Sequence, residues 1–261
     1  MNVEMWIRAL KAARAGADVS QEALAASIRW SPSTVAAIET GRRRPTMEFA
    51  VAADEALGTG GLLAGLLGAA DRQRLPTWFV PWRQYEEQAT RLCEFEPSLI
   101  PGLLQNEDYA RAVISAGGLN PAAVVDELVA VRMERQQLWQ RTEPPQCVFV
   151  LDEVALRRPV GGPPVLEGQL GRLLDLAQLP AVRLHVVPLD SGAHVGLTGG
   201  FLLAELPDGE RVTYVEDVAR GHVIDDPEVI RLIDRKWDSL LGEALSTSAS
   251  LDLIRKLRVT A

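Results

Sequence analysis

Few residues of this chain could do acid–base or nucleophilic chemistry. The three histidines of the 261-residue sequence are His185, His194 and His222. His194 lies in a loop, residues 190–200, in which four glycines and two hydroxyl side chains could bring the backbone close to a ligand. Asp190 and Ser191 add the composition of a catalytic triad, but a triad is defined by geometry and not by sequence neighbours. The alternative for this loop is a flexible connection between strands.

Adjacent carboxylates occur twice after expected strands, at Asp152–Glu153 and Glu216–Asp217. Neighbouring side chains on a strand point to opposite faces, so neither pair is expected to act on one substrate atom. The sequence lacks a phosphate-binding glycine motif, a serine nucleophile elbow and a zinc-protease helix. Two cysteines cannot form a usual zinc site and are not expected to form a structural disulfide. We therefore expect a protein that is not an enzyme and that uses no cofactor or metal ion.

A different chemistry, phosphate binding, is indicated by three consecutive guanidinium groups at residues 42–44. They follow two short expected helices. Ser20 is placed to cap the first helix, and Ser31 caps the second, which has Pro32 in its first turn. Gly41 stands where the second helix should end.

Two short helices joined by a tight turn predict a helix-turn-helix, whose second helix can enter a major groove because its outer face is small and polar. The expected DNA contacts are Gln21, Ser31, Ser33, Thr34, Ala37, Arg42, Arg43 and Arg44. This outer face is nearly uncharged, and phosphate contacts position a protein without specifying sequence. The alternative is therefore a helical hairpin that has kept this fold and lost DNA binding.

The same segment resembles the Cro/C1-type regulators, the XRE family, over about fifty residues. The motifs are Ser20-Gln21-Glu22-x-Leu24-Ala25, Ser33-x-Val35 and Ile38-Glu39-x-Gly41-Arg42-Arg43-x-Pro45. The resemblance implies an all-α domain with double-stranded DNA as its partner. The chain departs from actinobacterial relatives, which commonly carry Lys at Thr34, Ser at Ala36 and Arg at Ala37. Asp18 replaces a usual Gly, and Asp tolerates a left-handed conformation better than most residues.

Charge is unevenly distributed along the chain. The net charge is −8, yet residues 1–70 hold seven basic and seven acidic side chains, so the deficit belongs to residues 71–261. An acidic body is expected to stay away from DNA and to bind a small molecule, a second copy or a protein. No run of about 18 apolar residues predicts a membrane span. With no signal peptide expected, the bacterial cytoplasm is the expected location, nucleoid-associated when DNA is bound.

The expected fold has an all-α helix-turn-helix domain at 1–68 and an α+β effector or dimerisation domain at 69–261. The second domain should place helices around a small mixed sheet of about four strands, at 147–151, 182–188, 201–206 and 211–216. Its expected helices are 83–95, 107–115, 122–140, 165–179, 225–241 and 246–257. The glycine-rich apolar stretch 57–68 is either a flexible seam or, as we favour, a short buried helix packed between the domains.

The second domain also resembles the uncharacterised C-terminal domain of actinobacterial WhiJ-like regulators. Its motifs are Trp78-Phe79-x-x-Trp82, Glu96-Pro97-x-x-Ile100-Pro101-Gly102-Leu103-Leu104-Gln105, Tyr109-Ala110-Arg111, Arg132-x-Glu134-Arg135-Gln136, Asp152-Glu153-x-Ala155-Leu156-Arg157-Arg158 and Gly192-Ala193-His194. The resemblance implies a cytoplasmic regulator of a streptomycete-like bacterium, with a small BldB-like protein as a candidate partner. Some such pairs resemble toxin–antitoxin pairs.

Aromatic residues near the domain boundary could line an apolar pocket or a partner groove, although core packing is the alternative. The candidate ligand or partner residues are Trp78, Trp82, Tyr85 and His194. We expect a dimeric, sequence-specific DNA-binding transcriptional regulator whose C-terminal domain senses an unknown small-molecule effector or a protein. The competing expectation is an antitoxin-like module that mainly binds a small partner.

Overall fold

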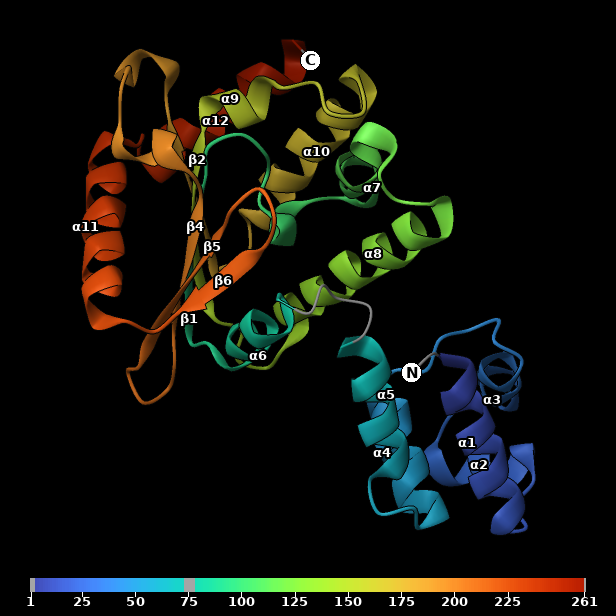
Figure 1. The fold of residues 1–261 in the computed structure, drawn as a ribbon. Helices are drawn as coiled ribbons and strands as arrows, with labels where there is room; N and C mark the ends of the chain where they lie inside the picture. The colour runs from blue at the N-terminus through green and yellow to red at the C-terminus, as the bar shows by residue number, and fades with distance from the viewer. Residues whose placement is uncertain (1–2, 73–77, 261) are drawn as a thin grey trace. The chain divides into compact units, whose positions relative to one another are not determined.

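The computed structural model describes residues 3–72 and 78–260. The chain divides into two compact units, residues 1–77 and 78–261, called here the head and the body (Figure 1). The division falls beyond the expected boundary at 68/69, because a helix at the end of the head continues to Arg72.

Five helices make up the head between residues 3 and 72. They are α1 (Val3–Gly16), α2 (Gln21–Ile28), α3 (Pro32–Glu39), α4 (Met47–Leu57) and α5 (Leu62–Arg72). The caps are as the sequence predicts, since Ser20 accepts a hydrogen bond from Ala23 N and Ser31 accepts one from Thr34 N. Each such cap typically contributes about 1 kcal/mol. The all-α helix-turn-helix architecture is thus confirmed.

α5 belongs to the core of the head. Leu63 and Leu67 are buried in one cluster with Trp6 and Phe49, and the Trp6 indole donates a 2.7 Å hydrogen bond to Leu63 O. The prediction of a buried helix in this stretch is confirmed. Its buried leucines contact α1 and α4 of the same unit, and packing of this helix between the domains stays a prediction.

A buried carboxylate fixes the start of α5. Asp54, near the end of α4, accepts 2.8 Å hydrogen bonds from the backbone amides of Leu63 and Ala64. Unpaired amides at a helix start favour a nearby negative charge. The intervening loop turns through Gly58 and Gly60, whose φ angles of 64° and 63° are left-handed. This glycine-rich loop is therefore anchored at both ends.

The body is built on a mixed sheet with strand order β3-β2-β1-β4-β5-β6. The strands are β1 (Arg91–Glu96), β2 (Gln146–Asp152), β3 (Val182–Val187), β4 (Phe201–Glu205), β5 (Arg211–Glu216) and β6 (Gly221–Ile224). β1, β2 and β3 are parallel, whereas β4, β5 and β6 pair antiparallel. The α+β class and the mixed sheet are confirmed.

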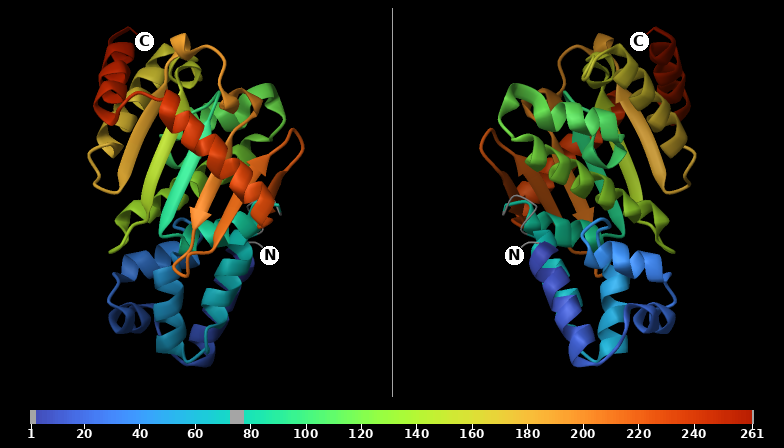
Figure 2. Two further views of the ribbon diagram at one scale, coloured as in Figure 1. Left: turned by 90° about the vertical axis from the view of Figure 1, so that its left-hand side faces the viewer. Right: turned by 90° about the vertical axis from the view of Figure 1, so that its right-hand side faces the viewer.

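Helices cover both faces of this sheet (Figures 1 and 2). They are α6 (Val80–Gln88), α7 (Glu107–Ser115), α8 (Ala122–Arg135), α9 (Glu153–Arg157), α10 (Pro163–Leu176), α11 (Pro227–Glu243) and α12 (Thr247–Thr260). α11 lies on one face, where Trp237 and Leu240 pack with Phe95 and Phe201. α8 and α10 lie on the other face.

The outer edge of β3 is covered by the chain that follows α11. Val186 N donates a 3.0 Å hydrogen bond to Ser250 Oγ, and Val186 O accepts a 2.8 Å bond from Leu245 N. At the opposite edge stands β6, a strand of four residues.

Three elements of the body, α6, β1 and β6, differ from expectation. The sheet has six strands rather than about four, because β1 and β6 were not predicted. The prediction of a helix at 83–95 is wrong, since α6 ends at Gln88 and β1 follows as a central strand. Apolar residues and glutamates are mixed in Arg91–Glu96 in a way that suits an amphipathic helix, and Glu94 suggests a solvated face although it is buried.

Other expectations are confirmed. α7 has the predicted bounds of 107–115, β4 and β5 form the predicted hairpin, and β2-α10-β3 is a parallel unit. None of the helices in the described part of the chain combines the length and apolar character that crossing a bilayer requires.

Candidate nucleic-acid interface

The turn that sets α3 against α2 is held by backbone geometry. α2 ends at Arg29, whose φ of 62° is left-handed, and Trp30 N donates a 3.0 Å hydrogen bond to Ala25 O. The Trp30 ring then meets Phe49 edge-on at 5.7 Å. Asp18, before α2, also has a left-handed φ of 52°, as its position in the resemblance implies. The two helices are therefore fixed relative to each other.

Three hydroxyl groups gather at the amino end of α3. Ser31 Oγ lies 2.9 Å from Ser33 Oγ and 2.8 Å from Thr34 Oγ1. Arg43 Nη1 donates to Thr34 Oγ1 at 3.3 Å, so a guanidinium from the following loop lies against the same group. A helix amino end carries partial positive charge and free amides, which favour phosphate. We call Ser31, Ser33, Thr34 and Arg43 the hydroxyl–arginine cluster.

The arginines after α3 differ in exposure. Arg42 and Arg43 are exposed, whereas Arg44 is half-buried. Arg42 Nε donates to Thr40 Oγ1 at 3.1 Å, and Arg43 N donates to Ala37 O at 3.0 Å, which folds this loop back on α3. Two guanidinium groups thus stand beside the second helix of the motif, where phosphate contacts are expected.

Gln21 and Arg14 meet a buried carboxylate. Arg14 binds Glu39 through Nε at 2.7 Å and Nη2 at 3.0 Å, and the Gln21 amide donates to Glu39 at 2.7 Å. Arg14 also donates to Val19 O at 2.9 Å. The amide nitrogen of Gln21 is therefore directed inward, and a DNA contact by Gln21 stays a prediction. Glu39 was not a predicted site residue, because an acidic residue near a helix end looks solvated in sequence.

The Glu39 network gives a pH-dependent prediction. Burial alone would raise the pKa of Glu39, but hydrogen bonds from Arg14 and Gln21 lower it below its ordinary value. A lowered folded-state pKa adds stability above the unfolded-state pKa of about 4.3, and this stability disappears as pH falls through the folded-state pKa. Glu39→Gln removes the charge, so we expect a loss on the order of 1–3 kcal/mol at pH 7.

Hydrogen exchange of the α1–α3 amides, followed by mass spectrometry, would measure this loss in the intact chain. The difference between the wild type and Glu39→Gln should shrink at acid pH, where Glu39 is protonated. A difference that is constant between pH 7 and acid pH would contradict the role given to the carboxylate charge.

The outer face of α3 presents no exposed charge among its own residues, because the one charged residue in the helix, Glu39, is buried. Ser33 is exposed, and Thr34, Ala36 and Ala37 are half-buried. A hydroxyl can bond to several base edges, and an alanine methyl can contact the methyl of thymine. Direct readout by this face would thus use small contacts rather than bidentate ones.

The predicted aromatic site in the body is mostly core. Trp82 is fully buried and stacks on Tyr214 at 5.3 Å, while Phe79 meets Tyr214 edge-on at 5.6 Å. Trp78 and Tyr85 are half-buried. The positions of Trp82 and Phe79 favour the core alternative for these two rings. A ligand or partner contact by Trp78 or Tyr85 stays a prediction.

His194 joins its glycine-rich loop to the end of β2. Its Nδ1 accepts a 3.2 Å hydrogen bond from Gly196 N, so Nε2 carries the proton and donates it to Asp152 at 3.0 Å. The side chain is 3% exposed. Both ring nitrogens are therefore occupied, and neither hydrogen bond involves Ser191. A ligand contact by His194 stays a prediction, and the observed contacts give it a structural role.

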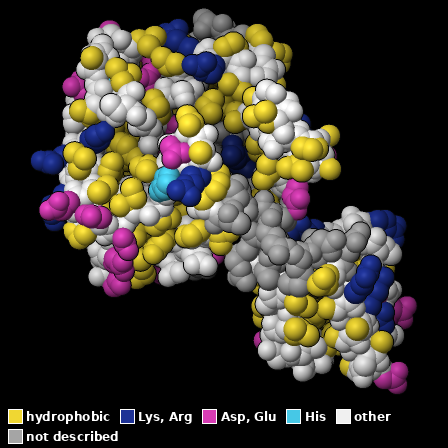
Figure 3. Space-filling view, viewed as in Figure 1, with side chains coloured by type: hydrophobic (Ala, Val, Ile, Leu, Met, Phe, Trp, Pro, Cys, Tyr) yellow, Lys and Arg dark blue, Asp and Glu magenta, His cyan; other side chains and the backbone are white. Residues whose placement is uncertain are grey.

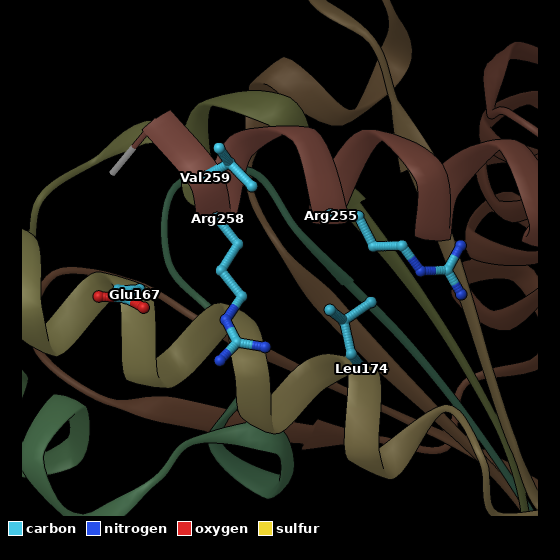
Figure 4. Close-up of a pocket in the computed structure, with 5 residues that line it drawn as sticks. All are labelled: Glu167, Leu174, Arg255, Arg258 and Val259. Atoms are coloured by element: carbon cyan, nitrogen blue, oxygen red, sulfur yellow. The ribbon is translucent and has the colours of Figure 1, made fainter.

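A recess of about 500 Å³ lies between α10 and α12 (Figure 4). Arg258 points from α12 towards α10, and its guanidinium lies beside Gly171. Arg255 is turned away and bonds Asp252 at 2.7 Å. No residue predicted from sequence lines this recess. Within residues 3–72 and 78–260, no three His, Cys, Asp or Glu side chains are grouped to hold a metal ion.

Two known families match this chain, one within the head and one within the body. Residues 8–67 match the family described as a helix-turn-helix domain. Residues 81–256 match the family described as Domain of unknown function (DUF5753). No curated protein and no solved structure matches the chain.

Proposed function

Because the chain belongs to the family of the domain of unknown function DUF5753 and carries a helix-turn-helix domain before it, we propose that it is a sequence-specific transcriptional regulator. The observation that carries this proposal is the hydroxyl–arginine cluster at the amino end of α3. It combines a helix amino end, hydrogen-bonding hydroxyls and an exposed guanidinium on one side of the head.

In the proposed complex, α3 enters the major groove. Arg42 and Arg43 bind phosphates beside it and fix its register. Ser33 and Thr34 then reach base edges, and Ala37 contacts a thymine methyl. The proposed regulator binds chromosomal DNA in the cytoplasm.

The proposal includes a homodimer. Two copies of α3 would occupy successive major grooves of a pseudo-palindrome, about 34 Å apart. The body would set the spacing of the heads, and an effector or protein bound to it would shift the balance between competent and incompetent arrangements. A particle mass that stays monomeric at micromolar concentration, with and without operator DNA, would contradict the dimer.

Fluorescence anisotropy tests the DNA-binding proposal. The intact chain is titrated onto labelled DNA from upstream of its own gene and onto a scrambled duplex of the same composition, at 50 and 200 mM salt. We expect preference for the first duplex and an affinity that falls at least roughly tenfold over this salt range. Equal, weak binding to both duplexes at low salt would count against the proposal.

The second candidate function is an antitoxin-like module that binds a small BldB-like partner, with DNA binding secondary. The observation that favours it is the outer face of α3, which offers no exposed charge for bidentate base contacts. Co-expression with a small BldB-like protein would distinguish the two. A stable complex that forms without DNA, from a chain that fails the anisotropy test, would put the partner-binding function first.

A further inference from the structure

The face of the sheet beneath α8 carries a polar cluster at its centre. Cys93 and Phe95 of β1 pack in the apolar cluster with α11, so Glu94 and Glu96 point to the opposite face. α8 brings Arg132 and Arg135 to this face. Buried carboxylates in a central strand are costly unless something compensates for their charge.

One of the two arginines is already paired. Arg135 binds Glu86 of α6 through two hydrogen bonds of 3.1 and 2.6 Å. Arg132 donates from Nη1 to Gln105 at 2.8 Å and forms no ion pair within the described residues. Gln105 is itself held, because its amide donates to Ile100 O at 2.7 Å. Arg132 is therefore positioned by a neutral partner and keeps most of its donors free of protein acceptors.

Glu94 and Glu96 have no such partner. Across residues 3–72 and 78–260, neither carboxylate accepts a hydrogen bond or forms an ion pair. Glu94 is only 6% exposed. Yet its oxygens and those of Glu96 are not among the fully enclosed polar atoms that lack a partner. The carboxylates therefore border space that a water-sized molecule can enter.

Neighbouring backbone shapes the walls of this space. Gly200 lies against the Glu96 carboxylate, and a Cβ there would come 3.2 Å from it. Gly221, at the start of β6, lies on the Tyr214 hydroxyl, which donates to Glu216 at 2.6 Å. Figure 3 shows a basic side chain (dark blue) recessed in the surface between the β6 edge and α8.

The cluster has more acidic than basic groups. With Arg135 and Glu86 paired, Arg132 faces the carboxylates of Glu94, Glu96 and Glu216. Burial and the Glu96 charge raise the pKa of Glu94 well above its ordinary value, and burial and Glu216 raise the pKa of Glu96 to about 7. Burial and Arg135 lower the pKa of Arg132 to about 10. The cluster thus holds more carboxylates than cationic groups, and no hydrogen-bond donor of the described residues reaches Glu94 or Glu96.

We propose that this cluster binds the protonated primary amine of a small organic molecule, with Glu94 and Glu96 accepting hydrogen bonds from the ammonium group. The free donors of Arg132 face the same space and take an oxygen acceptor, such as a hydroxyl or carboxylate, on that molecule. A bare metal ion fits less well, because the described carboxylates are not grouped as metal ligands. The inference rests on the proposed function only for its consequence, ligand-controlled DNA binding.

Titration calorimetry on the intact chain, without DNA, tests the site. The probes are 1,4-diaminobutane, 4-amino-1-butanol and 4-aminobutanoate, with 1,4-butanediol as the matched compound that lacks an ammonium group. We expect the amines to bind with dissociation constants of about 1 mM or tighter, as good small ligands do, and the diol not to bind. Tighter binding of the two oxygen-containing amines than of the diamine would support the role of Arg132, and the reverse order would overturn that role.

Amide variants identify the carboxylates. Glu96→Gln and Glu94→Gln keep side-chain shape, and each should weaken amine binding at least about tenfold. Glu228→Gln on α11, whose side chain is 89% exposed, should leave binding unchanged. Because an ammonium ligand drives off the proton of Glu96, binding near pH 7 should release protons in the wild type and fewer in Glu96→Gln.

Circular dichroism establishes that each variant is folded. If Glu94→Gln is unfolded, the test rests on the amine affinity of Glu96→Gln alone. No heat from any amine at about 10 mM, or amine affinity unchanged in Glu96→Gln, would overturn the site. Neither result touches the anisotropy test of DNA binding, so failures of the two proposals are distinguishable.

Discussion

Replacing Arg42 and Arg43 together with alanine is expected to weaken binding to the chain's own upstream DNA roughly 30-fold at 0.15 M salt. Each guanidinium that neutralises a phosphate releases condensed counterions, so the slope of log affinity against log salt should become shallower by about 2. Both side chains are exposed beside α3. Anisotropy titrations of the wild type and the double variant at four salt concentrations would measure both quantities.

A charge-matched control separates local contacts from overall charge. Arg8→Ala with Lys11→Ala removes the same two charges from exposed positions on α1. Seven basic and seven acidic residues make the segment 1–70 neutral, so long-range attraction should be weak. If the control lowers affinity and slope as much as Arg42→Ala with Arg43→Ala does, the loop after α3 is not the phosphate contact.

Glu86→Ala is expected to destabilise the body by about 3–5 kcal/mol, a large share of the stability of a domain this size. Glu86 and Arg135 are 2% and 9% exposed, and their paired hydrogen bonds join α6 to α8. Truncating the carboxylate leaves the buried Arg135 guanidinium, which lies 4.7 Å from the centre of the Phe79 ring, without its ion-pair partner. Urea unfolding followed by circular dichroism would show the loss.

Two companion variants show that the effect comes from an unpaired buried charge. Glu87→Ala, one residue along α6, breaks an exposed pair with Arg83 at 2.7 Å and should cost less than about 1 kcal/mol. Glu86→Leu combined with Arg135→Met should recover most of the stability lost in Glu86→Ala, because the pair is removed together. A double variant as unstable as Glu86→Ala would point to packing rather than charge.

The helices of the head follow from local sequence, whereas a central strand of the body does not. Ser20, Ser31 and Thr46 mark helix starts through contacts within three residues, so the caps are visible in sequence. β1 was mistaken for helix because Glu94 and Glu96 suggest a solvent-facing side. Their burial depends on strands and helices distant in sequence. Burial of a charged side chain depends on tertiary packing, which the hydrophobic periodicity of a single segment cannot predict.

For the candidate DNA site, the sequence predicts which residues take part but not how their side chains contact one another. Residue type and position along α3 suffice to nominate Ser33, Thr34 and Arg43. That Arg43 folds back to Thr34 depends on the loop conformation. The inward turn of the Gln21 amide depends on Glu39, which lies on another helix. Contacts between side chains of different elements were thus the part that sequence could not provide.

The two edges of the sheet bear on how copies of this chain can associate. An open strand edge is a template on which another chain can add a strand, and so a route to aggregation. At β3 this route is blocked, since Val186 N and O are bonded to Ser250 and Leu245. The four residues of β6 offer only a short ladder at the other edge. Any second copy should therefore join through helices or loops, and the body should resist strand-by-strand polymerisation at high concentration.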